Sequence, residues 1–226
     1  EGMEAYVAAM KSAKAESVVT GLDLGSGKNG LIRSFFLVET TKAADLQAAA
    51  RTLYEKIHEM KVGEVTTKVV VTPDSETFGK RKCDLITTTQ EVDPTSPGAG
   101  MVKKMNAILY GENGVQSRMT SLSDGLLLTQ GGGKESMEAA LQTYDSGHNS
   151  LADVRKDLPA ESHLLVLFDL PGLVYNGLLA ATTLPDVPVP FQRAAVEELQ
   201  IARSYGSVTA VGSEGSLNIQ AHVPVP

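Results

Sequence analysis

The start of this sequence combines a helix pattern, a strand, a glycine-rich turn and a second strand, and the same order returns at its end. Apolar side chains follow helical spacing over residues 3–14. Two runs rich in Val, Leu, Ile and Phe, residues 17–22 and 31–38, then enclose turn-forming residues between positions 25 and 30. These features predict a helix followed by a β-hairpin.

The end of the sequence repeats this order. Helical spacing over residues 191–205 precedes strand runs at 207–211 and 217–223, with a glycine-rich turn between them. Both hairpins begin with Ser-Val, and a recurring supersecondary unit indicates internal duplication. We therefore expect two related units whose hairpins superpose, each preceded by a helix on the same sheet face. Residues 1–150 would form the first unit, without its N-terminal strand, and residues 158–226 the start of a second, truncated unit.

The most regular helical pattern covers residues 46–60, where the apolar side chains share one helical face. Thr40 or Thr41 can cap its start, and Gly63 follows its last apolar residue, as glycine commonly does at helix ends. We expect a long amphipathic helix that ends near Gly63.

Strand patterns dominate the middle of the chain, with a loop expected over residues 73–79 and an irregular segment over 93–100. The runs that read as strands are residues 66–72, 83–92, 105–110, 115–122 and 126–130. The dipeptides Asn113-Gly114 and Asp124-Gly125 separate the last three runs and favour hairpins, because their residues tolerate positive φ. This order predicts an α+β fold, in which largely antiparallel sheets of tight hairpins carry helices on one face.

Helix and strand patterns continue to the end of the chain. A glycine run at 131–133 precedes a helix pattern over residues 137–144, and a polar linker follows over 145–157. A buried strand is expected over 163–169, and Pro171 can open the next helix, because proline is tolerated in a first turn. The prolines between residues 184 and 190 predict a stiff connector.

Composition excludes several kinds of partner. The net charge of −7 comes without a basic stripe, so we expect no nucleic-acid partner. No apolar run approaches the roughly 18 residues of a membrane span, so we expect no membrane-spanning segment. Cys83 is the only cysteine, which leaves no disulfide framework and no thiolate metal site, and we interpret it as a packing residue.

Two glycine-rich segments invite a phosphate-binding interpretation. The first, at residues 25–28, does not match the phosphate-loop pattern at either end, and we interpret it as a hairpin turn. The second comprises Gly131, Gly132, Gly133 and Lys134, between a strand and a helix, where free N–H groups and the helix dipole could bind an anion. A strand-to-helix connection can also require glycine merely to turn, with positive φ at Gly132 and Gly133.

No catalytic or cofactor signature is complete. The histidines His58, His148, His163 and His222 show no metal-ligand spacing, and neither a nucleophile elbow nor a Ser-x-x-Lys pair of the penicillin-binding type is present. We therefore expect no catalytic residues, no metal and no other cofactor. A triad assembled from distant residues is not tested by the sequence.

The C-terminal region resembles the start of a unit found in uncharacterised exported or envelope proteins of planctomycete-type bacteria. The resemblance rests on Leu-Pro-Ala-Glu-Ser at residues 158–162, the strand over 163–169 and Leu-Pro-Gly-Leu at 170–173. It covers mostly residues 158–175 and 205–226. It implies an extracytoplasmic protein, periplasmic or on the cell surface, and transfers no functional residue.

Two functions of different classes follow. The first is a non-catalytic binding or scaffold protein of the bacterial cell envelope, which binds a protein partner or self-associates. Repeated Thr-rich sheets without clustered titratable residues favour this function, because they suit binding surfaces better than catalytic pockets. The alternative is a hydrolase or anion-binding enzyme that uses Gly131–Lys134. A pocket with convergent polar groups at that loop would favour the enzyme, and a flat sheet face would favour the scaffold.

Overall fold

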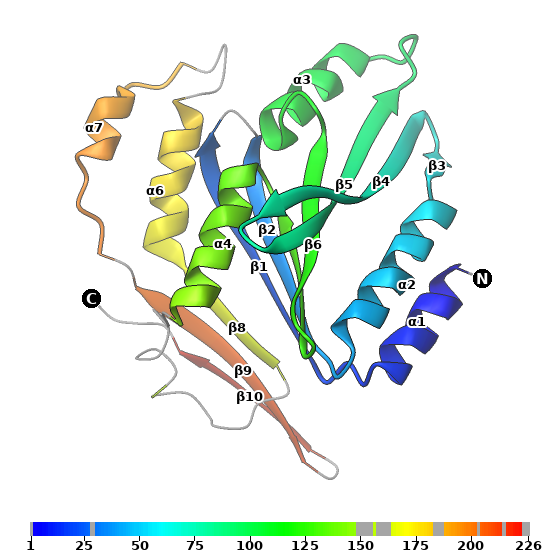
Figure 1. The fold of residues 1–226 in the computed structure, drawn as a ribbon. Helices are drawn as coiled ribbons and strands as arrows, with labels where there is room; N and C mark the ends of the chain where they lie inside the picture. Colours follow the sequence, from blue (N-terminus) through cyan, green and yellow to red (C-terminus); the bar gives the residue numbers. More distant parts are fainter. Residues whose placement is uncertain are drawn as a thin grey trace. The chain divides into compact units, whose positions relative to one another are not determined.

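Each of the two units of this chain, Glu1–Gln142 and Thr143–Pro226, is built on its own antiparallel sheet (Figure 1). The computed structural model describes residues 2–27, 30–147, 156, 164–182, 188–202, 204–213 and 216–222. Antiparallel pairing throughout both sheets, together with helices, confirms the predicted α+β class.

The first unit contains a seven-stranded sheet in the order β1-β2-β7-β6-β5-β4-β3. Its strands are β1 (Ser17–Gly27), β2 (Gly30–Glu39), β3 (Glu59–Val62), β4 (Val65–Phe78), β5 (Arg81–Val92), β6 (Val115–Ser123) and β7 (Leu126–Gly131). Its helices are α1 (Gly2–Ser12), α2 (Ala43–Lys56), α3 (Ala99–Tyr110) and α4 (Lys134–Ser146), the last of which crosses the boundary to the second unit. The first hairpin, the β6–β7 hairpin at Asp124-Gly125 and the helix after the glycine run are confirmed.

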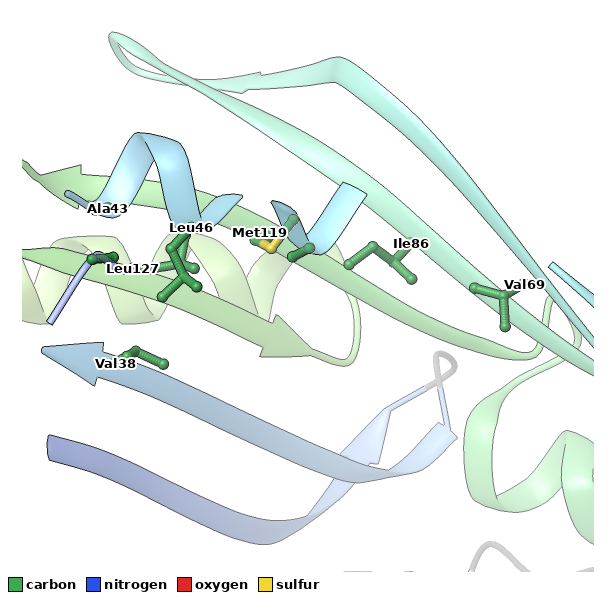
Figure 2. Packing of buried hydrophobic residues seen from close by; sticks show 9 residues of the cluster. Val38, Ala43, Leu46, Val69, Ile86, Met119 and Leu127 are labelled. Atoms are coloured by element: carbon green, nitrogen blue, oxygen red, sulfur yellow. The ribbon is translucent and has the colours of Figure 1, made fainter. Parts of the chain in front are cut away.

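Helices cover both faces of this sheet. On one face, Leu46 of α2 packs against Val38, Met119 and Leu127 from three different strands (Figure 2). The opposite face carries Leu128, which packs with Met137 and other residues of α4. Successive strand residues point to opposite faces, so α2 and α4 lie on opposite sides of β7. The expectation of helices on a single face is therefore corrected.

The α2 helix ends earlier than its apolar spacing indicates. It stops at Lys56, and Met60 lies in β3, which pairs with β4. Gly63 has a φ of 59° in the turn between these two strands, so it does not close the helix. Thr40 and Thr41 do not cap α2 either, because its N-cap position is Lys42; both threonine hydroxyls donate to the carbonyl of Ala13 after α1, and the Thr40 oxygen also accepts the N–H of Lys42 at 3.4 Å. Strand pairing to β4 has overridden the helical pattern.

Two further predictions for the first unit are wrong. Residues 105–110 belong to helix α3, whose ends are marked by Gly98 and Gly111 with φ of 87° and 84°. A short apolar run does not by itself distinguish a helix from a strand. Residues 73–78 are not a loop, because β4 continues to Phe78 with an irregularity in its register between Thr72 and Glu76.

The second unit contains β8 (Leu164–Asp169), α6 (Leu170–Ala181), α7 (Arg193–Glu197), β9 (Tyr205–Ser213) and β10 (Ser216–His222), with strand order β10-β9-β8. The carboxylate of Asp169 accepts the N–H of Gly172 at 2.9 Å, and Pro171 occupies the first turn of α6, as expected. The predicted helix over 191–205 is wrong, since only Arg193–Glu197 is helical among the described residues of this range and Tyr205 pairs with Asp169 in the sheet.

The two terminal hairpins differ in their position within their sheets. In the first, the second strand β2 continues the sheet by pairing with β7. In the second, the first strand β9 continues it by pairing with β8. The duplication into related units therefore stays a prediction. Residues 148–155 and 157 of the polar linker, most of the proline-rich connector and the tips of both hairpins lie outside the described residues.

Candidate functional sites

The loop predicted to bind an anion connects β7 to α4, as expected. Gly132 has a φ of 108°, which confirms the expected positive φ there, whereas Gly133 does not have one. The N–H of Gly132 donates to the carbonyl of Gln116 at 3.0 Å, and its carbonyl accepts Nη1 of Arg118 at 2.8 Å. Both backbone groups of Gly132 are therefore used within the protein, so its N–H does not serve an anion.

The charge of Lys134 is also engaged. Its ammonium lies 3.2 Å from the carboxylate of Glu76, which in turn accepts Nε of Arg118 at 2.5 Å. Burial raises the pKa of Glu76, but the contacts with Arg118 and Lys134 outweigh it and the net pKa lies below its usual value. Glu76 is therefore ionised at neutral pH, and the three groups together carry one net positive charge.

One polar group at this loop has no partner. The Oγ of Ser136, in the first turn of α4, is buried and makes no hydrogen bond within the described part of the chain. It lies beside Gly132, since a Cβ added there would come within 2.9 Å of it. Nothing in the local sequence distinguishes this serine, because its burial depends on the packing of α4 on the sheet.

A second polar cluster joins α2 to the sheet through Asp84, which is fully buried in β5. Its carboxylate accepts Nε and Nη2 of Arg51 at 2.7 and 2.6 Å, Nε2 of Gln47 at 2.9 Å and the N–H of Asp74 at 2.9 Å. Burial raises the pKa of Asp84, but these hydrogen bonds lower it below its usual value. The carboxylate is fully occupied, so it stabilises the fold and offers no free general base.

A cavity of about 240 Å³ lies between the helices α1 and α2 and one face of the sheet. Its lining residues are Tyr6, Phe36, Ala50, Leu53, Tyr54, Met119, Leu127 and Thr129. Burial raises the pKa of Tyr6 and of Tyr54, and the proximity of Tyr54 raises that of Tyr6 further. No sequence pattern reveals this site, because its residues come from five separate elements.

The edge strand β1 exposes apolar side chains of the first unit. It stands at the end of the sheet order, where β2 is its neighbour. Val18, Val19 and Leu22 are 48%, 50% and 74% exposed, and no charged residue or proline interrupts residues 17–22. The opposite edge strand β3 is short and carries Glu59 and Lys61, which is the usual protection of an exposed edge.

Cys83 and the histidines are the other residues that the sequence singles out. The thiol of Cys83 is buried in the core, and burial raises its pKa, as suits a packing residue. His58 and His222 are exposed, whereas His148 and His163 lie outside the described residues. Among the residues that the structure describes, no group of three or more His, Cys, Asp or Glu could hold a metal ion. None of the described helices is long and apolar enough to cross a membrane.

No family model, no curated protein and no solved structure matches this chain.

Proposed function

We propose that this chain is a non-catalytic binding protein, which takes an extended segment of a protein partner as an additional strand at β1. The observation that carries the proposal is the exposed, uncharged edge formed by residues 17–22. An exposed strand edge presents a row of N–H and C=O groups that a second chain can pair with.

Side chains on both faces of the edge support this interaction. Val18 and Leu22 lie on the same face of β1 as Thr20. Thr20 pairs with Phe36 of β2, so Phe36 lies on that face beside them. Val19 lies on the other face, where Phe35 on β2 is adjacent and 39% exposed. An added strand alternates its side chains between the two faces, so it would find apolar contacts on each.

The alternative anion-binding enzyme has less support. The N–H of Gly132 and the ammonium of Lys134, two of the groups that such a site requires, contact Gln116 and Glu76. A thermal-shift measurement with inorganic phosphate tests it. Stabilisation that disappears in Lys134→Met would favour the enzyme.

The placement in a bacterial cell envelope rests on the resemblance of residues 158–175 and 205–226. Fractionation of the cells that produce this protein tests it, and recovery with cytoplasmic markers would contradict it.

Strand addition is tested with extended peptides selected by display on the wild-type chain. We expect bound peptides to slow hydrogen exchange over residues 17–27, and Val19→Lys and Leu22→Lys each to weaken binding by at least about tenfold, since a charge on an edge strand opposes pairing. Val62→Lys, on the opposite and already charged edge, is the matched control and should leave binding unchanged. Peptides that bind both β1 variants as well as the wild type would contradict the proposal.

A further inference from the structure

We infer that the cavity between α1, α2 and the sheet binds a small neutral molecule with an apolar, aromatic body and one hydrogen-bond acceptor. The occupant of this site is a small molecule, whereas the edge of β1 would pair with a protein chain, and the two sites share Phe36.

The size of the cavity limits the ligand to one or two rings. Its volume is about 240 Å³. An apolar protein cavity of about 150 Å³ accommodates benzene, and drug-sized ligands occupy pockets of roughly 300 Å³ or more. The volume here lies between these two cases. Phe36 in the wall is 37% exposed, so part of the wall reaches the surface.

The lining determines the chemistry of the ligand. Leu53, Leu127 and Met119 are apolar, and the Met119 thioether suits contact with an aromatic ring. None of the lining residues is charged, so an ionic ligand would lose its hydration without compensation. A neutral, largely apolar molecule therefore fits best.

Hydroxyl groups supply the polar contact. Tyr6 and Tyr54 are protonated at neutral pH, as tyrosines ordinarily are, and burial raises the pKa of both further. Within the described residues, neither hydroxyl makes a hydrogen bond, so each has a donor to offer. An acceptor such as a carbonyl oxygen on the ligand would satisfy it.

The cavity is maintained by the polar cluster around Asp84. Gln47 and Arg51 of α2 are anchored to the carboxylate of Asp84, and Gln47 also accepts the N–H of Ser121. These contacts fix the height of α2 above the sheet. Ala50 lies between the two anchors and has the smallest side chain in the lining. The space in front of it therefore stays open, because the anchored helix does not move in to fill it.

Three related probes test the inference. Each is titrated into the whole chain, and binding is monitored by ¹H–¹⁵N chemical shifts. Acetylnaphthalene is a neutral ketone; ethylnaphthalene lacks the hydrogen-bond acceptor; naphthoate is an anion. We expect saturable binding of the ketone. The hydrocarbon should bind about fivefold more weakly, because it lacks one hydrogen bond. The anion should bind at least about tenfold more weakly than the ketone, because its charge would lose hydration in the cavity.

Variants locate the binding. Ala50→Leu fills the cavity and should abolish binding of both neutral probes, whereas Ala48→Leu, on the exposed side of α2, should not. The double variant Tyr6→Phe, Tyr54→Phe keeps both rings and should remove the advantage of the ketone over the hydrocarbon, which tests the site even if Ala50→Leu fails to fold. Absence of saturable binding to the wild type, or binding that survives both sets of changes, would overturn the inference.

Discussion

The carboxylate of Asp84 accepts the backbone N–H of Asp74 at 2.9 Å, so that a fully buried residue of β5 fixes the point at which β4 departs from regular pairing. Asp74 has a φ of 50°, a conformation that residues other than glycine rarely adopt. The same carboxylate anchors Arg51 of α2. One side chain thus positions both the irregular strand and the helix above it.

Asp84→Asn should destabilise the first unit by about 3 kcal/mol, because it removes the charge that Arg51 and Gln47 contact in a buried site. Urea denaturation followed by circular dichroism measures the change. Glu91→Gln, which breaks the exposed ion pair with Lys68, is the matched control and should leave the urea midpoint unchanged. Equal effects of the two substitutions would show that the cluster around Asp84 has no special role.

Stability should fall when the solution is acidified. Asp84 and Glu76 have pKa values below the usual 3.8 and 4.5, so at low pH the unfolded chain binds protons before the folded chain does. Their contribution is present at neutral pH and decreases below about pH 5, as the pH falls toward the folded pKa values. Urea midpoints between neutral and acidic pH measure the dependence. In Glu76→Gln the slope should be shallower, and an unchanged slope would exclude Glu76 as a contributor.

Ser136→Ala should leave stability unchanged or raise it by up to about 1 kcal/mol, because the hydroxyl is buried without a partner. Ser121→Ala is the comparison, since its hydroxyl donates to Gln47 at 2.9 Å and its loss should destabilise by about 1 kcal/mol. Thermal or urea unfolding of both variants measures the difference. A clear loss of stability in Ser136→Ala would indicate that this hydroxyl has a partner after all.

Gly132→Ala should destabilise the first unit by at least about 1 kcal/mol, because its φ of 108° is strained for any residue with a Cβ. Gly100→Ala in α3 is the control, since its φ is not positive and nothing lies within 4 Å of the added Cβ. Alanine there should stabilise by roughly 0.5 to 1 kcal/mol. If Gly132→Ala proved as well tolerated, the loop would have to adopt another conformation.

Local features of the sequence determined much of the fold. The hairpin at Asp124-Gly125, the first hairpin and helix α4 were all predicted, because turn chemistry and apolar spacing act over a few neighbouring residues. The positive φ at Gly132 was predicted for the same reason. By contrast, residues 105–110 form a helix rather than a strand, and residues 59–62 form a strand that pairs with the neighbouring β4 rather than a helix end, because short apolar runs fit both patterns.

Only the tertiary structure decided the sites. Glu76 and Arg118 are 42 positions apart, and Arg51 and Asp84 are 33 positions apart, so no spacing motif reveals either pair. The cavity needs side chains from two helices and three strands, and the exposure of Val18 and Leu22 depends on β1 being the edge of the sheet. Charge pairing, cavities and free edges are properties of non-local contacts, and these form only when strands and helices distant in sequence come together.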